Sequence, residues 1–208
     1  MLICAENIKK ALSGKLPGSV SHNKMLPPNR VLKAPPGDTK RLKFSSVLLL
    51  LFIENKNLMA CLIKRPAHMK HHAGQIALPG GRIEKGETAV ETALRETFEE
   101  IGIQSEQIEI LGSLSEVYVE VSRFQIHPFV AWLKNKPRFN LNFNEVKKTI
   151  LFPVSNIKPP FNQVELNTIS GKLSVPCIKF EGEIIWGATA MILSEFSDVL
   201  NEYFTIQE

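Results

Sequence analysis

The chain of 208 residues is long enough to bury one good-sized core, and its 44% hydrophobic and 22% charged residues are ordinary for a folded globular protein. Its formal net charge of +4 is too small to indicate binding to nucleic acid or to a membrane. The three cysteines are odd in number and widely separated, which favours reduced thiols in a cytoplasmic protein over a disulfide framework or a zinc site.

The N-terminal part of the chain predicts a short helix followed by an irregular arm. A rough apolar stripe predicts the helix over residues 2–13, and the first residues lack the pattern of a secretory signal. Residues 16–40 contain five prolines among several Asn, Ser and Gly, which indicates irregular structure. We therefore expect residues 1–40 to pack on or flank a domain formed by residues 41–208.

A hairpin and a basic loop follow the arm. Residues 44–53 and 58–65 are predicted strands joined by a turn. The longest apolar run, residues 47–53, is too short to span a bilayer and has the length of a buried strand. Residues 66–75 predict a polar loop rich in basic side chains, and residues 76–81 predict a short strand that enters a glycine turn.

The rest of the chain mixes strands and helices without the regular rhythm of a doubly wound sheet. Its clearest element is a helix over residues 87–103. The other predicted elements are strands over 108–121 and 125–133, a turn followed by a helix or strand over 143–157, a hairpin over 173–190, and an amphipathic helix over 190–204. This order predicts an α/β fold, a sandwich around a mixed sheet.

The helix over residues 87–103 carries a run of acidic side chains. With 100° per residue, five residues form one face that we expect to be buried: Val90, Ala93, Leu94, Thr97 and Ile101. Glu96, Glu99 and Glu100 then lie at roughly 240°, 180° and 280° from Val90, on the opposite side. Like charges three and four residues apart destabilise a helix by about a few tenths of a kcal/mol per pair. Taken alone, such a run is typical of a solvated acidic face.

The residues around this helix form a longer pattern. Seven positions follow the spacing G-x5-E-x7-R-E-x2-E-E-x-G: Gly81, Glu87, Arg95, Glu96, Glu99, Glu100 and Gly102. If each position matches by chance about one time in fifteen, a chain of this length shows all seven with odds on the order of one in a million. The pattern resembles the Nudix box, the signature of the Nudix hydrolases.

The resemblance implies both a fold and a chemistry. The fold is a Nudix-type α/β/α sandwich with a mixed β-sheet, in which a loop-helix-loop segment bears the box. The chemistry is hydrolysis of a nucleoside diphosphate linked to another group, with a divalent metal, Mg²⁺ or Mn²⁺. The resemblance assigns the metal to three box glutamates and one carbonyl group: those of Glu96, Glu99, Glu100 and Gly80. It also makes Glu87 and Arg95 a structural pair that holds the loop onto the helix, with Gly81 and Gly102 as structural glycines.

The residue types suit this chemistry. Mg²⁺ is a hard ion that takes oxygen ligands, and carboxylates at i, i+3 and i+4 offer them from one helix. The metal can neutralise the pyrophosphate and position a water as nucleophile, and a nearby carboxylate can take the proton of that water. The identity of this base stays open among five glutamates, two within the box and three outside it: Glu96, Glu99, Glu116, Glu120 and Glu145.

Residues 62–81 form a second motif, LIKRPAHMKHHAGQIALPGG. It is similar to a motif of the coenzyme A pyrophosphatase branch of the Nudix hydrolases, and it matches that motif at Leu62, Arg65, Gly74, Pro79, Gly80 and Gly81. It departs from the motif at Ile63, Lys64, Pro66, Lys70 and Leu78. Lys70 replaces an arginine and therefore lacks its bidentate fork. Thr97 in the box and the sequence VPCIKFEGEIIWGATAMIL also resemble that branch.

The two motifs together imply hydrolysis of coenzyme A to 3′,5′-ADP and 4′-phosphopantetheine, with acyl derivatives as further candidate substrates. The basic loop is a candidate site for the additional phosphate, and a solvated loop is the alternative. The candidate substrate-binding residues are Lys64, Arg65, Lys70 and His72. Phe180 and Trp186 are candidates for a groove that holds the adenine or pantetheine group, although core packing is the favoured role for both.

Two other functions remain open. The first is a Nudix hydrolase of another nucleotide, such as ADP-ribose or a nucleoside triphosphate. The second is a non-catalytic protein that senses a nucleotide, which the intact charged positions of the box argue against. The implied partner is a small nucleotide, with neither nucleic acid nor membrane, and the chain is expected to be a monomer or a homodimer.

Overall fold

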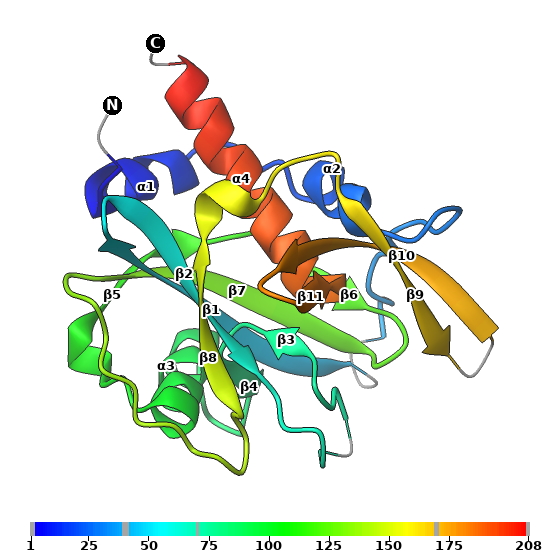
Figure 1. Ribbon diagram of the computed structural model, residues 1–208, viewed down its shortest axis with the longest axis horizontal. Helices are drawn as coiled ribbons and strands as arrows, with labels where there is room; N and C mark the ends of the chain where they lie inside the picture. The colour runs from blue at the N-terminus through cyan, green and yellow to red at the C-terminus, as the bar shows by residue number, and fades with distance from the viewer. Residues whose placement is uncertain (1–2, 39–41, 70, 169–170, 207–208) are drawn as a thin grey trace.

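The computed structural model describes residues 3–38, 42–69, 71–168 and 171–206 (Figure 1). The helices are α1 (Ala5–Leu12), α2 (Ser19–His22), α3 (Ala89–Ile101) and α4 (Gly187–Ile206), with 3-10 turns η1 (Asn23–Met25), η3 (Ser105–Gln107) and η4 (Val154–Asn156). The strands are β1 (Lys43–Glu54), β2 (Asn57–Lys64), β3 (Ile76–Ala77), β4 (Gly80–Arg82), β5 (Ile108–Ser113), β6 (Val117–Val119), β7 (Phe124–Leu133), β8 (Lys148–Pro153), β9 (Asn162–Thr168), β10 (Gly171–Phe180) and β11 (Glu183–Trp186). Over these described ranges, none of the helices has the length and apolar content that a membrane span requires.

The main sheet combines parallel and antiparallel pairs. Within the described residues it has eight strands, with the order β3–β2–β1–β7–β5 along its main path. In addition, β4 pairs with β1, β6 with β7, and β8 with β2. β1 and β7 run parallel, with Leu48 opposite Phe129, whereas β1 pairs with β2 and β4 in the antiparallel sense. The prediction of a mixed sheet is therefore confirmed.

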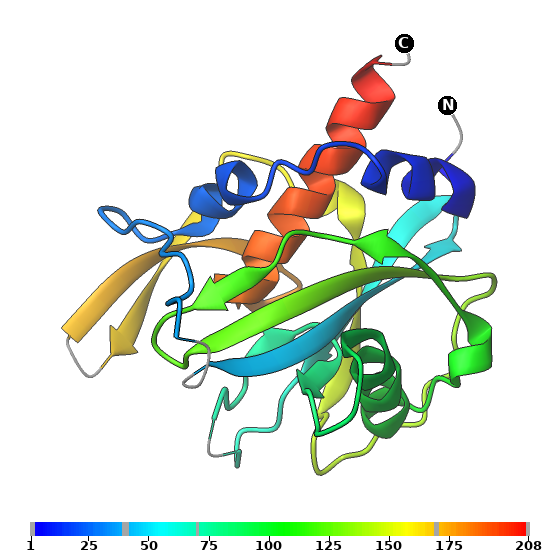
Figure 2. The same cartoon turned by 180° about the vertical axis from the view of Figure 1, so that it is seen from behind.

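Helices cover both faces of this sheet. α3 lies on one side, and α4 lies on the other together with α1 and α2 (Figures 1 and 2). Successive side chains of a strand point to opposite faces, so the apolar run of β1 contributes to two cores. Leu48 and Leu50 pack in the core that contains Ile101 of α3, whereas Leu49 packs in the core that contains Phe196 of α4. The predicted α/β/α sandwich is therefore confirmed.

A second, smaller sheet extends the α4 side of the molecule. β9, β10 and β11 form it in the order β11–β10–β9 (Figure 1). The hairpin predicted over residues 173–190 is present as β10 and β11, but its last residues begin α4 at Gly187 instead of extending the strand. β9 was not predicted, because the polar sequence NQVELNT carries no apolar run and its partner strand lies later in the chain.

Several predicted segments differ from the observed elements in their detail. The strand expected over residues 108–121 is divided into β5 and β6, and the strand expected over 76–81 is divided into β3 and β4. Residues 143–157 were expected to form a turn followed by either a helix or a strand, and they contain a strand, β8, followed by η4. β8 forms a strand because its residues pair with β2, with Ile150 opposite Leu62, and this long-range pairing is not visible in a local pattern.

The N-terminal segment contributes side chains to the main core. Ile8, Leu12 and Met25 are buried in the core on the α4 side of the sheet. Residues 19–25, which were expected to be irregular, form the helical turns α2 and η1 against α4. The predicted boundary at residue 40 lies outside the described residues.

Candidate active site

The helix that carries the box glutamates, α3, has well-defined ends. At its start the Thr88 hydroxyl accepts a hydrogen bond from the Glu91 N–H, and the Glu91 carboxylate accepts one from the Thr88 N–H, which together form a capping box. At its end Gly102 adopts a φ of 75°, a left-handed conformation that glycine tolerates best. The predicted structural role of Gly102 thus has a geometric basis.

Glu100 is buried against the sheet. Its side chain is 1% exposed, and its Oε2 accepts a hydrogen bond of 2.9 Å from the Gly80 N–H at the start of β4. Burial raises the pKa of Glu100 to about 8, although the Gly80 hydrogen bond and Arg65 act in the opposite direction. The prediction that this side chain lies opposite the buried face is wrong, because its position on the helix borders that face.

Glu96 lies over the glycine turn that precedes the helix. A Cβ atom at Gly81 would overlap the Glu96 carboxylate, so the absence of a side chain at Gly81 lets this carboxylate sit against the backbone. Gly80 has a φ of 150°, and a Cβ atom there would overlap the Ser46 carbonyl in the neighbouring strand β1. Burial raises the pKa of Glu96, while Arg95 opposes the shift. The two glycines thus bring strand β4 and helix α3 close together.

A third carboxylate joins this pair from a distant loop. Glu145 precedes β8, and carboxylate oxygens of Glu96, Glu100 and Glu145 all lie within 4.8 Å of one another. The loop is held by backbone hydrogen bonds, 3.1 Å from the Asn142 N–H to the Glu100 carbonyl and 2.9 Å from the Glu145 N–H to the Asn142 carbonyl. Glu145 was expected only as one candidate base among five, and the structure brings it into the carboxylate group.

Glu99 lies beside this carboxylate group and shares the Arg95 Nη1 donor with Glu96. Its side chain is 47% exposed, and its Oε2 accepts a hydrogen bond of 3.1 Å from Arg95 Nη1. Glu99 is not among the three glutamates whose oxygens lie within 4.8 Å of one another, so its role as a metal ligand stays a prediction.

Arg95 connects the helix to the preceding loop. Its Nε and Nη2 atoms donate hydrogen bonds of 2.6 and 3.1 Å to the two carboxylate oxygens of Glu87. This is the bidentate contact that the resemblance implies between the two side chains. The hydrogen bonds from Arg95 and Thr92 lower the pKa of Glu87 to about 2. Arg95 also donates a hydrogen bond of 3.0 Å to Glu96, so it partly neutralises the carboxylate group.

The predicted substrate-binding residues, at the end of β2 and in the basic loop, do not lie together in the structure. The Arg65 Nη1 atom lies 3.5 Å from Glu100 Oε1, and its buried Nε has no hydrogen-bond partner within the described residues. Lys64 lies on the opposite face of the sheet and binds the Glu183 carboxylate. His72 is exposed and contacts the Gln75 side chain, and Lys70 lies outside the described residues. Only Arg65 among these described residues contacts the carboxylate group.

The other candidate bases have partners elsewhere. Glu116 lies 2.9 Å from the His127 ring, and Glu120 pairs with Lys33 of the N-terminal arm at 2.6 Å. Of the two candidate groove aromatics, Phe180 packs edge-on against Phe152 with ring centroids 5.2 Å apart, and Trp186 is partly buried at the end of β11. The contact of Phe180 with Phe152 agrees with the favoured core-packing role.

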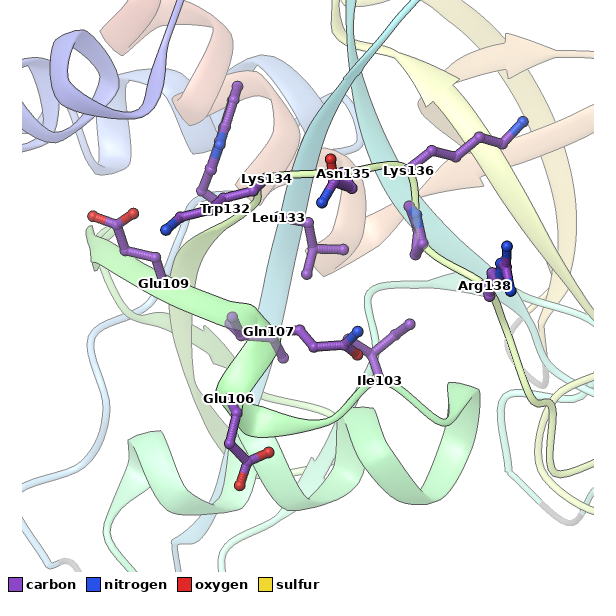
Figure 3. Close-up of a pocket in the computed structure, with 12 residues that line it drawn as sticks. Ile103, Glu106, Gln107, Glu109, Trp132, Leu133, Lys134, Asn135, Lys136 and Arg138 are labelled. Atoms are coloured by element: carbon purple, nitrogen blue, oxygen red, sulfur yellow. The ribbon is translucent and has the colours of Figure 1, made fainter.

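A hollow in the described residues lies away from the carboxylate group. It has a volume of about 670 Å³ and is formed by η3, the start of β5 and the loop that follows β7. Figure 3 shows Ile103, Gln107 and Leu133 at its centre, with Glu109, Lys134 and Arg138 around them. None of the predicted site residues lines this hollow, so we place the candidate active site at the carboxylate group.

The carboxylate group suits a divalent cation. Glu96, Glu100 and Glu145 offer oxygen ligands from two segments, and oxygen is the ligand type that Mg²⁺ prefers. Burial opposes the charged form of Glu100 and Glu96, so a cation there would offset a cost that Arg65 and Arg95 offset only in part. The residues that are present therefore fit the divalent metal that the box implies.

Comparison with known proteins adds an independent line of evidence. The family model described as NUDIX domain matches residues 42–170, which include β1, the basic loop and α3. Nudix hydrolase 3 of Caenorhabditis elegans is 36% identical over 115 residues, which are 54% of this chain and 48% of that protein. The match thus spans about half of the length of this relative.

Two further matches cover a larger share of the proteins to which they are made. The uncharacterized Nudix hydrolase NudL of Pectobacterium atrosepticum is 31% identical over 139 residues, which are 65% of this chain and 72% of that protein. The crystal structure of the MutT protein from Methanosarcina mazei Go1 superposes with a TM-score of 0.53 and 18% identity, and the match covers 77% of this chain and 96% of the MutT chain. The structural match supports the sandwich fold alone.

Proposed function

Because the chain belongs to the NUDIX family, we propose that it is a pyrophosphohydrolase that splits the diphosphate of coenzyme A into 3′,5′-ADP and 4′-phosphopantetheine. The observation that carries the hydrolase chemistry is the convergence of Glu96, Glu100 and Glu145 beside the glycine turn of β4. The coenzyme A assignment is supported by the motif of residues 62–81, whose Arg65 reaches the carboxylate group. Acyl derivatives of coenzyme A are further candidate substrates.

Nudix hydrolases generally use divalent metal ions, and we propose Mg²⁺ or Mn²⁺ for this chain, held by Glu96, Glu100 and Glu145. When bound, such an ion supplies positive charge that neutralises the diphosphate and activates a water. The Gly80 N–H holds the Glu100 carboxylate in place, and Gly81 leaves room for that of Glu96. Arg95 and Glu87 fix the loop over residues 82–88 against α3, so that the carboxylates keep their positions.

Two groups of the chain are assigned to the remaining tasks. Arg65 has a guanidinium group at the carboxylates and an unpaired buried Nε, so we assign it to a phosphate oxygen of the substrate. The proton of the attacking water is assigned to a carboxylate, either Glu145 in the group or the exposed Glu99 beside it. We also assign the protein to the cytoplasm, because Cys61 and Cys177 are buried as free thiols.

A substrate panel tests this function. Purified protein is incubated with coenzyme A, dephospho-coenzyme A, ADP-ribose and diadenosine polyphosphates, each with Mg²⁺ and with Mn²⁺, and the products are separated by chromatography. We expect the highest kcat/KM with coenzyme A and release of 3′,5′-ADP. A clear preference for ADP-ribose would overturn the coenzyme A assignment and leave the hydrolase chemistry standing. Tight binding of a nucleotide without turnover would instead indicate a sensor.

A further inference from the structure

Two lysines and one glutamate form a charged cluster on the face of the sheet opposite α3. Lys64 is the last residue of β2 and lies directly opposite Lys148, the first residue of β8. The Lys64 Nζ atom lies 2.8 and 2.7 Å from the two carboxylate oxygens of Glu183 in β11. The Lys148 Nζ atom lies 3.0 Å from the same carboxylate.

The charges of this cluster do not balance. Like charges directly opposite each other on neighbouring strands are destabilising, so the lysine pair needs an anion between the two ammonium groups. Among the described residues, the Glu183 carboxylate is the one anion that contacts this pair, and it carries a single negative charge. A phosphate monoester carries up to two negative charges near neutral pH and more acceptor oxygens, so it matches the lysine pair better than Glu183 does.

The cluster lies beside the candidate active site, across the end of strand β2. Arg65 follows Lys64 directly and approaches Glu100, whereas Lys64 points to the other face of the sheet. The Lys147 N–H donates a hydrogen bond of 2.8 Å to the Lys64 carbonyl, so this end of β8, which begins just after Glu145, stays close to β2. The carboxylate group and the lysine pair therefore flank the same end of β2 and β8 from opposite faces of the sheet.

Glu183 comes from a part of the fold that is separate from the lysines. It begins β11 in the small sheet, directly after a tight turn in which Glu181 and Gly182 have φ values of 48° and 77°. The lysines belong to two paired strands of the main sheet, so an anion can replace Glu183 without loss of any hydrogen bond between those strands. Lys148 is 48% exposed, so solvent reaches the cluster.

We propose that Lys64 and Lys148 form a subsite for a phosphate monoester of the substrate, distinct from the diphosphate that is hydrolysed, and that Glu183 occupies this subsite in the free protein. A substrate that fills this subsite must carry a phosphate on its nucleoside in addition to the diphosphate. The identification of that group with the 3′-phosphate of coenzyme A rests on the proposed function. Glu183 lowers the apparent affinity, because the phosphate must displace it before binding.

Binding of product analogues tests the subsite without turnover. Titration calorimetry with 3′,5′-ADP and with 5′-AMP, in the presence of EDTA, compares the wild type with Glu183→Gln. We expect Glu183→Gln to bind 3′,5′-ADP about tenfold more tightly, since one competing charge-assisted contact is removed, and to bind 5′-AMP with nearly unchanged affinity. Glu181→Gln, in the same turn but exposed, is the matched control and should change neither affinity.

A lysine variant completes the experiment. Lys148→Met should weaken 3′,5′-ADP binding and abolish the gain of Glu183→Gln when the two are combined, whereas Lys147→Met at the exposed neighbouring position should have little effect. Thermal unfolding of every variant establishes that it is folded. Equal changes for 3′,5′-ADP and 5′-AMP, or no change for either, would overturn the subsite. Coenzyme A hydrolysis together with an unchanged 3′,5′-ADP affinity in Glu183→Gln would refute the subsite while the proposed function stands.

Discussion

At the scale of single residues, the three carboxylates of the candidate site differ in their surroundings. Glu100 is buried, Glu96 lies between Gly81 and Arg95, and Glu145 arrives from a loop. Burial favours the protonated form of a carboxyl group, whereas a bound cation favours the charged form. The stability of the protein should therefore depend on pH and on metal together, and Glu100 should dominate that dependence.

The first prediction concerns the pH dependence of stability. The pKa of Glu100 is about 8 in the folded state, above its ordinary value of 4.5, so the folded state holds this proton more tightly than the unfolded state. The contribution of Glu100 is therefore full below about pH 4.5, and the free energy of unfolding without metal should fall between pH 5 and 8, by up to about 1.4 kcal/mol per pH unit. Urea unfolding with EDTA at several pH values measures this slope.

Glu100→Gln is the control for this prediction. Glutamine keeps the shape but cannot lose a proton, so the slope should be much smaller in this variant. Addition of Mg²⁺ or Mn²⁺ at pH 8 should stabilise the wild type and have little effect on Glu100→Gln, whose activity should fall by roughly a thousandfold. An equal slope in both proteins would show that other groups, such as the histidines, control the pH dependence.

The second prediction separates Glu145 from Glu99. Because Glu145 belongs to the carboxylate group and Glu99 does not, Glu145→Gln should weaken Mn²⁺ binding by about tenfold or more, and Glu99→Gln should weaken it only slightly. Calorimetric titration with Mn²⁺ measures both affinities. If the ranking were reversed, Glu99 would be the metal ligand. A variant that keeps its metal affinity but loses kcat would identify the base.

At the scale of secondary-structure elements, the N-terminal arm and α4 are joined by a buried polar network. The Glu195 carboxylate of α4 accepts hydrogen bonds from the Gly18 and Ser115 N–H groups and lies 2.9 Å from His22 Nε2. Neither side chain of the His22–Glu195 pair is more than 1% exposed. Nearby, Asp198 binds Ser21 and Lys24 at the surface of the same interface. The arm is thus positioned by polar contacts as well as by apolar packing.

The third prediction addresses this network. Glu195→Ala leaves the buried His22 ring and the partly buried N–H groups of Gly18 and Ser115 without this acceptor, so it should lower the free energy of unfolding by about 3–5 kcal/mol. Asp198→Ala, which removes the more exposed contacts of the same helix, should cost about 1 kcal/mol. Denaturant unfolding followed by circular dichroism gives both values. A loss for Glu195→Ala no larger than that for Asp198→Ala would contradict a structural role of the buried pair.

At the scale of the whole molecule, the N-terminal segment and the rest of the chain share one core. The prediction of an irregular arm that flanks a domain could not show this, because the short helix α2 has no sequence period of its own. Ile8, Leu12 and Met25 pack with residues of α4 and of the main sheet. Residues 1–38 are therefore expected to be part of the cooperative folding unit.

The fourth prediction follows from this shared core. A protein that lacks residues 1–38 loses three buried side chains worth about 1.5–3 kcal/mol each, and total stabilities of domains are about 5–15 kcal/mol. It also leaves Glu195 without His22 and Gly18. We expect it to be strongly destabilised or unfolded, as judged by thermal unfolding against the full chain. Cooperative unfolding close to that of the full chain would support a separable domain from residue 41 onward.

The sequence was sufficient where the deciding interactions are local. The start and end of α3 depend on Thr88, Glu91 and Gly102, and the resemblance to the Nudix box implied the contact between Glu87 and Arg95 that the structure shows. The apolar run of β1 predicted a buried strand, and the order of elements predicted the mixed sheet. These features follow from helix caps, helix spacing and strand burial, which a single segment specifies.

The tertiary structure was needed wherever distant segments meet. Glu145 joins Glu96 and Glu100 because the loop before β8 is hydrogen-bonded to the end of α3, and no local pattern encodes that approach. The burial of Glu100, the exposure of Glu99 and the pairing of Lys64 with Glu183 depend in the same way on packing between elements. Spacing along one helix places the carboxylates around an axis, but the sheet and the loops packed against that helix determine which of them can share an ion.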